Sequence, residues 1–177
     1  MQHISFDLEA LTRSSIGPLV QIGACKFDPV DGIGDTFIRT VKLSSLKKYG
    51  LDICPETLEW WMQQEPAAIA SVFNVPDAVS LRQALWEYVE WVGKHGDYVY
   101  WSHSTYDPPL LFNNFNAVGI NSPIPFRAYR DIRTLMYLSG PVTLEREGVH
   151  HNALDDAIHQ AKYISIALNR ITSWTTK

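Results

Sequence analysis

A strand pattern at the N-terminus sets two carboxylates against an apolar core. Ile4, Phe6 and Leu8 alternate with polar residues, which is the periodicity of a β-strand with one buried face. Because side chains two residues apart point to the same side of a strand, Asp7 and Glu9 lie together opposite those apolar side chains. Two neighbouring carboxylates repel each other, and a bound Mg²⁺ or Mn²⁺ ion removes that cost. The same spacing is also typical of a solvated edge strand, so alone it does not define a site.

Length and composition narrow the class of protein. The chain has 177 residues, of which 46% are hydrophobic and 12% aromatic, which fits a single domain spanning residues 1–177 and excludes a disordered or collagen-like chain. A formal charge of −4 argues against a protein that coats nucleic acid by bulk electrostatics, but it is compatible with an enzyme that grips a few phosphates through metal ions. Without an apolar run long enough to span a bilayer, a signal-peptide pattern or a metal-like cysteine spacing, we expect a cytoplasmic protein with reduced thiols and no membrane contact.

The order of periodic segments predicts an α/β fold. Turn residues at 28–32 separate two strand patterns and indicate a meander, so the sheet begins antiparallel. Strands then alternate with helices, which predicts a mixed sheet of about five strands flanked by helices. The expected strands are 3–9, 19–27, 36–43 and 98–101, with an extended segment at 126–129, and the expected helices are 57–64, 81–94, 108–118, 133–138 and a final helix from the N-cap Asn152 to about 171.

A third acid, Asp107, stands at the junction between a strand and a helix. It follows the strand expected at 98–101 and precedes two prolines that are typical of a first helical turn. An aspartate in this place is commonly an N-cap. The position therefore allows either a structural or a chemical role.

The segment 150–157 (HHNALDDA) contains a histidine followed five residues later by an aspartate in two different frames. Helical periodicity separates the frames only weakly, since it places Asp156 somewhat nearer the apolar stripe of the last helix. A zinc site is disfavoured because adjacent histidines point in different directions and no cysteine joins them. The alternatives are His150 with Asp155, His151 with Asp156, and a zinc site of His150, His151 and His159.

Taken in this order, the three acidic segments resemble the motifs of DEDD-type 3′–5′ exonucleases of the DEDDh subclass, which have an RNase H-like fold. The matching segments are 4–9 (ISFDLE), 101–107 (WSHSTYD) and 151–157 (HNALDDA), and the third alignment selects His151 with Asp156. The second motif departs from the family pattern, because serine and histidine occupy places often filled by glycine or asparagine and Tyr106 replaces the commoner phenylalanine. These changes remove no carboxylate, and they bear on how the substrate fits.

A narrower resemblance lies outside the three motifs. The segments 21–24 (QIGA), 57–64 (TLEWWMQQ) and 131–134 (DIRT) are similar to small phage and prophage exonucleases of the DexA-like group and to mycobacterial-type exoribonuclease domains. The resemblance covers nearly the whole chain.

The resemblance implies two-metal-ion hydrolysis that releases nucleoside 5′-monophosphates from the free 3′ end of a single-stranded nucleic acid. A histidine suits the role of general base because its ordinary pKa is about 6.5. Relatives are often homodimers. The implied catalytic set is His151 as general base, with Asp7, Glu9, Asp107 and Asp156 as ligands of two Mg²⁺ or Mn²⁺ ions and Asp7 in the bridging position.

Aromatic residues supply the candidate substrate contacts. Trp60 and Trp61 are adjacent on an expected helix, so they cannot both face the core, and an exposed ring can stack on a base. Gln64, one turn later, is either a hydrogen-bond partner of a base or sugar or a surface residue. By analogy with the family, Leu8 is a wedge between the terminal bases and Tyr106 contacts substrate. The tryptophan pair and the phage-like resemblance favour single-stranded DNA; the alternatives are single-stranded or A-rich RNA and a nucleic-acid-binding module without turnover.

Overall fold

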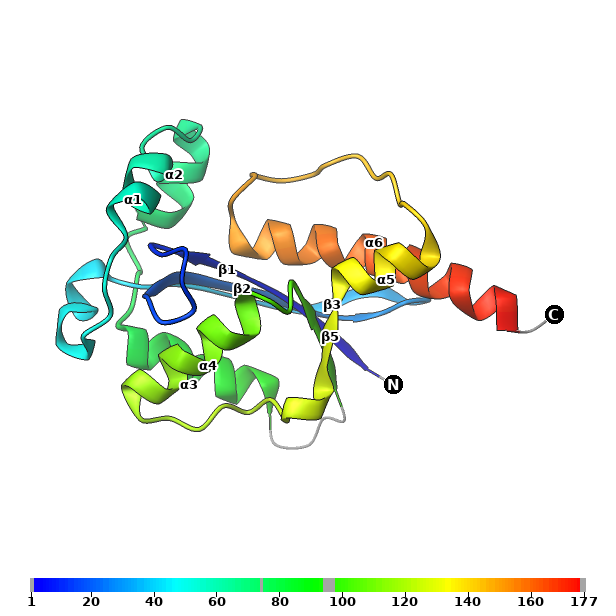
Figure 1. Cartoon of the computed structure of the whole chain (residues 1–177), viewed down its shortest axis with the longest axis horizontal. Coiled ribbons are helices and arrows are strands. Elements are labelled where there is room, and N and C mark those ends of the chain that lie inside the picture. The colour runs from blue at the N-terminus through cyan, green and yellow to red at the C-terminus, as the bar shows by residue number, and fades with distance from the viewer. Residues whose placement is uncertain (1, 74, 94–97, 176–177) are drawn as a thin grey trace.

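The computed structural model describes residues 2–73, 75–93 and 98–175, in which five strands form one mixed sheet (Figure 1). The strand order is β3-β2-β1-β4-β5, with antiparallel pairing on one side of β1 and parallel pairing on the other. This confirms the predicted mixed sheet with an antiparallel start. The strands are β1 (His3–Ala10), β2 (Leu19–Asp28), β3 (Gly32–Thr40), β4 (Val99–Ser102) and β5 (Tyr129–Asp131).

Helices cover both faces of the sheet. Figure 1 shows α5 (Ile132–Ser139) and α6 (Ala153–Thr175) on one face and α3 (Leu81–Val92) and α4 (Asp107–Val118) on the other. The short helices α1 (Pro55–Trp61) and α2 (Pro66–Phe73) lie at one end of the sheet, after the turns η1 (Leu43–Ser45) and η2 (Lys47–Tyr49). Among the described residues, no helix combines the length and the apolar character needed to cross a membrane.

Strand β1 is central in the sheet and is buried on both sides. Ile4, Phe6 and Leu8 belong to the larger apolar cluster, which also includes side chains of α3 and α4. On the other face, Ser5 is fully buried and Glu9 is 7% exposed. The acids of β1 therefore do not lie on a solvated edge strand, and at least one of them has little contact with water.

Several boundaries differ from the sequence-based expectations. The segment 126–129, expected to be extended, forms the 3₁₀ turn η3 (Phe126–Ala128) before β5 begins. The third strand, expected at 36–43, begins at Gly32 and ends at Thr40, because it pairs with β2 directly from the hairpin turn onward. Helix α2 was not anticipated, because eight residues carry too few turns for a clear period. Helix α3 ends at Val92, where Gly93 has a φ of 78°, and residue 94 of the expected helix lies outside the described residues.

The start of α6 is seated directly on β2. Gln21 accepts a hydrogen bond at Oε1 from the backbone N–H of Ala153 at 2.9 Å. A Cβ atom added to Gly23 would lie 2.0 Å from the carbonyl carbon of Ala153, so only glycine permits this approach. Asn152 accepts hydrogen bonds at Oδ1 from the backbone N–H groups of Leu154 and Asp155, which confirms it as the helix cap. Because Gly23 is the cross-strand partner of Asp7, α6 begins beside the acids of β1.

A methyl group at Gly23 tests this contact. We expect Gly23→Ala to lower the free energy of unfolding by about 3 kcal/mol, because overpacking must push α6 away from the sheet. Gly34→Ala is the matched control, since its Cβ would meet its nearest neighbour, the Lys26 carbonyl oxygen, at an ordinary 3.5 Å. Urea denaturation measures both changes. Equal stability of the two variants would contradict the proposed seating of α6.

Candidate active site

Carboxylates from three elements gather at one cavity of about 430 Å³. Asp7 and Glu9 come from β1, Asp107 from the first turn of α4, and Asp156 from the first turn of α6. His151, in the turn before α6, lines the same cavity. The structure thus brings together the five residues that the sequence motifs singled out for metal binding and catalysis.

Hydrogen bonds fix two of these acids. Asp107 accepts a bond at Oδ2 from the backbone N–H of His103 at 3.0 Å, and it does not cap α4, whose N-cap residue is Tyr106. Asp7 accepts a bond at Oδ1 from the Nε2 of Gln160 at 2.7 Å. The Oε1 atom of Gln160 is buried and finds no hydrogen-bond partner among the described residues. The site therefore contains an unsatisfied acceptor beside its carboxylates.

Glu9, His151 and Asp156 form a group of metal-binding size. Each offers one ligand atom, and these atoms lie within 4.8 Å of one another. The side chain of Asp156 also pairs with Arg146. Asp155 instead accepts a hydrogen bond from the backbone N–H of Val149 at 2.7 Å, so it stabilises the preceding turn. The geometry groups His151 with Asp156 rather than with Asp155.

The other histidines lie close by without forming such a group. His150 and His159 line the cavity, but within the described part of the chain the three histidines do not constitute a metal-sized cluster.

An unusual backbone conformation holds His151. Its φ is 62°, in the left-handed region that non-glycine residues seldom occupy. Its ring lies edge-on to Trp60, with ring centroids 4.8 Å apart, and 6.0 Å from the ring of Trp61. The ring is therefore supported by the helix α1 on one side and reaches the carboxylates on the other.

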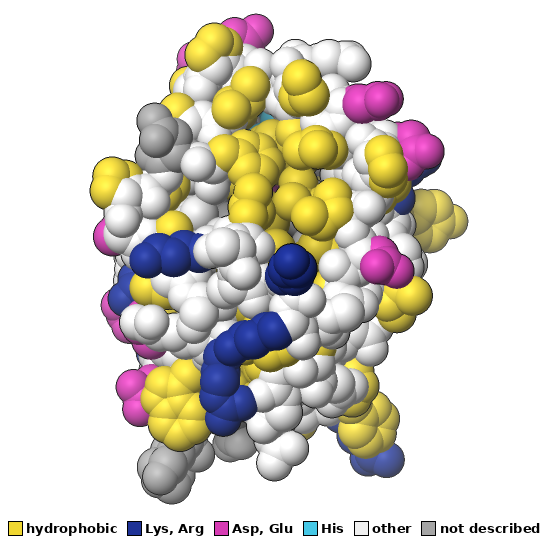
Figure 2. All heavy atoms as spheres, turned by 90° about the vertical axis from the view of Figure 1, so that its left-hand side faces the viewer, with side chains coloured by type: hydrophobic (Ala, Val, Ile, Leu, Met, Phe, Trp, Pro, Cys, Tyr) yellow, Lys and Arg dark blue, Asp and Glu magenta, His cyan; other side chains and the backbone are white. Residues whose placement is uncertain are grey.

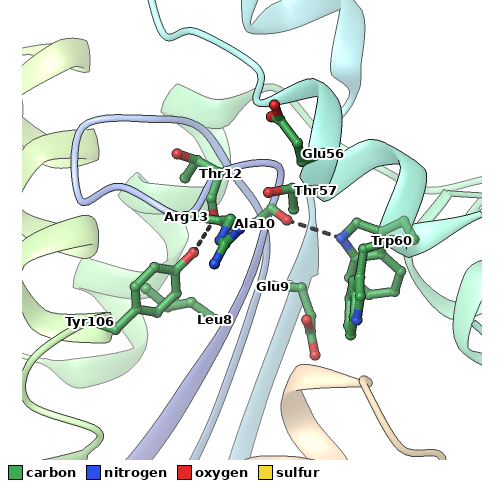
Figure 3. A pocket seen from close by; sticks show the side chains of 10 residues that line it. Leu8, Glu9, Ala10, Thr12, Arg13, Glu56, Thr57, Trp60 and Tyr106 are labelled. Atoms are coloured by element: carbon green, nitrogen blue, oxygen red, sulfur yellow. Dashed lines mark hydrogen bonds between the residues drawn. The ribbon is translucent and has the colours of Figure 1, made fainter.

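An apolar groove of about 630 Å³ adjoins the acidic cavity. Leu8, Glu9 and Tyr106 line both, so the two spaces meet at the end of β1. Figure 2 shows apolar side chains gathered in a hollow on the face where α1 lies. Figure 3 shows Trp60 and Tyr106 on opposite sides of the groove, with Leu8 and Glu9 between them. The hydroxyl of Tyr106 donates to the Thr12 carbonyl oxygen at 2.6 Å, which fixes its ring.

The two tryptophans have different environments. Trp60 is 41% exposed, whereas Trp61 is 2% exposed and donates its indole N–H to the Ala10 carbonyl oxygen at 3.0 Å. Trp61 lines the groove but is almost fully buried, so of this pair it is Trp60 that offers an exposed ring for stacking. Gln64 donates its Nε2 to the Trp60 carbonyl oxygen at 2.8 Å and is not among the described residues that line the groove. Its place is at the end of α1.

Burial and mutual repulsion disfavour the charged forms of the acids. Burial, followed by the charges of Asp107 and Glu9, raises the pKa of Asp7 well above its usual value. Burial, followed by the charges of Asp156 and Asp107, raises the pKa of Glu9 to about 8. Burial raises the pKa of Asp107 to about 7. Burial, followed by the charge of His150, lowers the pKa of His151, which keeps its imidazole neutral near pH 7.

These shifts predict how stability depends on pH. In metal-free protein the folded acids keep protons that the unfolded chain has lost, so the free energy of unfolding falls as pH rises from about 5 to about 8. Glu9→Gln flattens this profile, because the amide does not titrate. Mn²⁺ added at pH 8 raises the unfolding free energy of the unmodified chain, since it binds the folded state. Chemical denaturation in EDTA and in Mn²⁺ measures both effects, and a flat profile for the unmodified metal-free protein would contradict them.

Several residues of the cavity were not predicted from the sequence. Gln160 is four residues after Asp156 and so shares its helix face, which could have identified it. Arg146 lies in an irregular segment, where no periodicity indicates direction. His103, Arg133 and Tyr163 also line the cavity, and each comes from a different element or turn.

Comparison with solved structures finds the same fold in other proteins. Escherichia coli exonuclease I in complex with a dT13 oligonucleotide superposes with a TM-score of 0.61 at 12% identity, covering 96% of this chain and 40% of that one. Schizosaccharomyces pombe Pop2p, in its Mg²⁺- and Mn²⁺-bound form, gives 0.54 at 14% identity over 95% and 82%. Exonuclease X in complex with 5′ overhanging duplex DNA gives 0.54 at 16% identity over 94% and 92%. The chain thus spans about 40% of the length of exonuclease I.

Residues 2–168 match the 3′–5′ exoribonuclease Rv2179c-like domain, and the chain belongs to this family. This family is one of 3′–5′ exonuclease domains, which are enzymes of the nuclease class. A search of curated protein sequences found no match.

Proposed function

We propose that this chain removes nucleoside 5′-monophosphates from the 3′ end of single-stranded nucleic acid, with RNA as the preferred substrate. The observation that carries the proposal is that a carboxylate cavity adjoins an apolar groove, with His151 of the cavity in contact with Trp60 of the groove. The exoribonuclease family to which the chain belongs favours RNA. Single-stranded DNA is the second candidate, because exonuclease I was solved with a dT13 oligonucleotide. Because Trp61 is buried, the pair of adjacent tryptophans no longer favours DNA as two exposed rings would.

The donor set fits divalent metal ions. Clustered carboxylates with raised pKa values, together with the unsatisfied Oε1 of Gln160, leave the metal-free site short of positive charge. Pop2p was solved with Mg²⁺ and Mn²⁺. When bound, two such ions supply activation of water and stabilisation of the leaving oxygen. The residues proposed to hold them are Asp7, Glu9, Asp107 and Asp156.

His151 is the proposed general base. Its imidazole is neutral near pH 7, so it can accept a proton from the attacking water. The edges of Trp60 and Trp61 restrict its ring, and the left-handed backbone sets its direction toward the acids. The leaving 3′ oxygen stays on the shortened strand, and the phosphate leaves with the terminal nucleoside.

The groove is the proposed site of the terminal base. Stacking on an aromatic ring stabilises a base by about 1–3 kcal/mol and tolerates every base. Trp60 offers an exposed ring, and Leu8 lies at the boundary between the groove and the carboxylates. The proposed role of Leu8 is to separate the terminal base from its neighbour, while Tyr106 forms the opposite wall.

A ladder assay tests the reaction. We expect 5′-labelled single-stranded RNA and DNA of the same sequence to shorten progressively from the 3′ end in Mg²⁺ or Mn²⁺ and to stay intact in EDTA. The faster ladder identifies the preferred sugar. Asp7→Asn is expected to abolish the ladder, because it removes one carboxylate ligand, and it also controls for contaminating nuclease. Intact oligonucleotides under every condition would instead support a binding module without turnover.

Two adjacent histidines provide a matched pair for the same assay. His151→Ala should lower kcat by about 10²–10⁴-fold, the usual contribution of a general base, while Mn²⁺ binding measured by calorimetry is retained. His150→Ala should have a much smaller effect. The reverse order of effects would mean that the frame of His150 with Asp155 carries the chemistry.

A further inference from the structure

Arg133 contributes an exposed positive charge to the acidic cavity. It belongs to the first turn of α5, is exposed, and lines the cavity together with Asp107 and His103. The structure gives its guanidinium no ion pair or hydrogen bond with any of the described residues, whereas Arg146, in the same cavity, pairs with Asp156. Burial, followed by the charge of Arg133, lowers the pKa of His103, which places the guanidinium within electrostatic reach of the site.

The start of α5 is itself held in place. Asp131 accepts hydrogen bonds from the backbone N–H of Thr134 at 2.8 Å and from that of Ser104 at 3.2 Å. These bonds tie α5 to the turn after β4, the same turn that leads to Asp107. Arg133 therefore projects from a backbone with a fixed position relative to the carboxylates.

An unpaired guanidinium at this place suits a phosphate. Its planar fork of N–H donors matches two phosphate oxygens, and such charge-assisted bonds are strong. A guanidinium at the edge of the cavity adds attraction for a phosphodiester to that of the ions that the carboxylates are proposed to hold. Asp107, which lines the same cavity, accepts a hydrogen bond from the backbone N–H of His103, and the charge of Arg133 reaches it without an ion pair or hydrogen bond.

The polarity of the nucleic-acid strand determines which phosphate Arg133 can contact. Under the proposed function the scissile phosphate lies at the carboxylates, and the terminal nucleoside carries no phosphate on its 3′ side. Any second phosphate in the site must therefore lie on the 5′ side of the scissile one. The groove that receives the terminal base is lined by α1, and Figure 1 shows α5 in a different part of the molecule, along the face that α6 covers.

We propose that Arg133 binds the backbone phosphate immediately 5′ of the scissile phosphate and so holds the strand that remains after cleavage. This inference rests on the proposed function. It also gives a role to the segment 131–134, which the four carboxylates and His151 leave without one. Arg133 is in this account a substrate-binding residue that positions the scissile bond.

Single neutral phosphates in the substrate test the contact. Oligonucleotides carry one methylphosphonate at the first, second or third linkage on the 5′ side of the scissile one. We expect a first-position methylphosphonate to weaken binding to the unmodified chain, and to lower kcat/KM, by about tenfold or more, the usual effect of losing a charged hydrogen bond. Arg133→Gln should show a similar loss with ordinary substrate and little further loss with the first-position methylphosphonate. Arg133→Lys should keep part of the affinity for ordinary substrate and should still bind the first-position methylphosphonate more weakly than that substrate.

Arg130→Gln is the matched control. Arg130 is also exposed, lies three residues before Arg133, donates to the carbonyl oxygens of Arg127 and Tyr129, and does not line the cavity. The Arg130→Gln substitution removes the same charge from the same surface region. This variant should respond to every methylphosphonate as the unmodified chain does.

Dissociation constants from fluorescence anisotropy in Ca²⁺ are measured beside turnover in Mn²⁺. Non-additive losses for Arg133→Gln at the first linkage alone would support the inference. Additive losses at all three linkages would overturn it. Absence of turnover together with non-additive binding would contradict the proposed function while leaving Arg133 as a phosphate-binding residue.

Discussion

The close contact between α6 and β2 is the constraint on which the site depends. Gly23 lets the first residues of α6 rest against the backbone of β2, and the Gln21 side chain accepts the N–H of Ala153. Gln21 is in turn held by donating its Nε2 to Thr40 and to the Ser71 carbonyl oxygen, each at 2.8 Å. A buried amide thus joins β2, β3, α2 and α6, and through this junction His151 and Asp156 are brought to the carboxylates of β1.

Charge repulsion is the cost of this arrangement. Asp7 and Glu9 lie on the central strand, and burial raises the pKa of each because water no longer stabilises the charged form. The ion pair between Arg146 and Asp156 and the amide of Gln160 offset only part of the negative charge. A site of this kind is stabilised by the ligands that it is built to bind, so stability and metal binding are linked.

The local patterns predicted the elements that carry the site, because each extends over enough residues to show a period. The strand with Asp7 and Glu9, the junction at Asp107 and the final helix are present in the structure. Periodicity could not choose between His150 and His151, because both precede α6 and His151 has a left-handed backbone to which helical phase does not apply. That choice came from the resemblance, and in the structure His151 lies with Glu9 and Asp156.

Other features depend on contacts between distant segments, so no local sequence pattern could predict them. Burial of Trp61 and exposure of Trp60 follow from how α1 packs against the end of β1, where Trp61 donates to the Ala10 carbonyl oxygen. The placement of Arg133 and Arg146 follows from the paths of α5 and of the segment before α6. The geometry of short elements and irregular segments is set by such tertiary contacts.

Anomalous diffraction from crystals soaked in Mn²⁺ and a nucleoside 5′-monophosphate tests the central claim most directly. The account predicts manganese among the carboxylates of Asp7, Glu9, Asp107 and Asp156, with the imidazole of His151 free of metal and the base of the nucleotide against Trp60. Manganese bound by Glu9, His151 and Asp156 together, a group that the geometry permits, would make His151 a metal ligand and would contradict its role as general base.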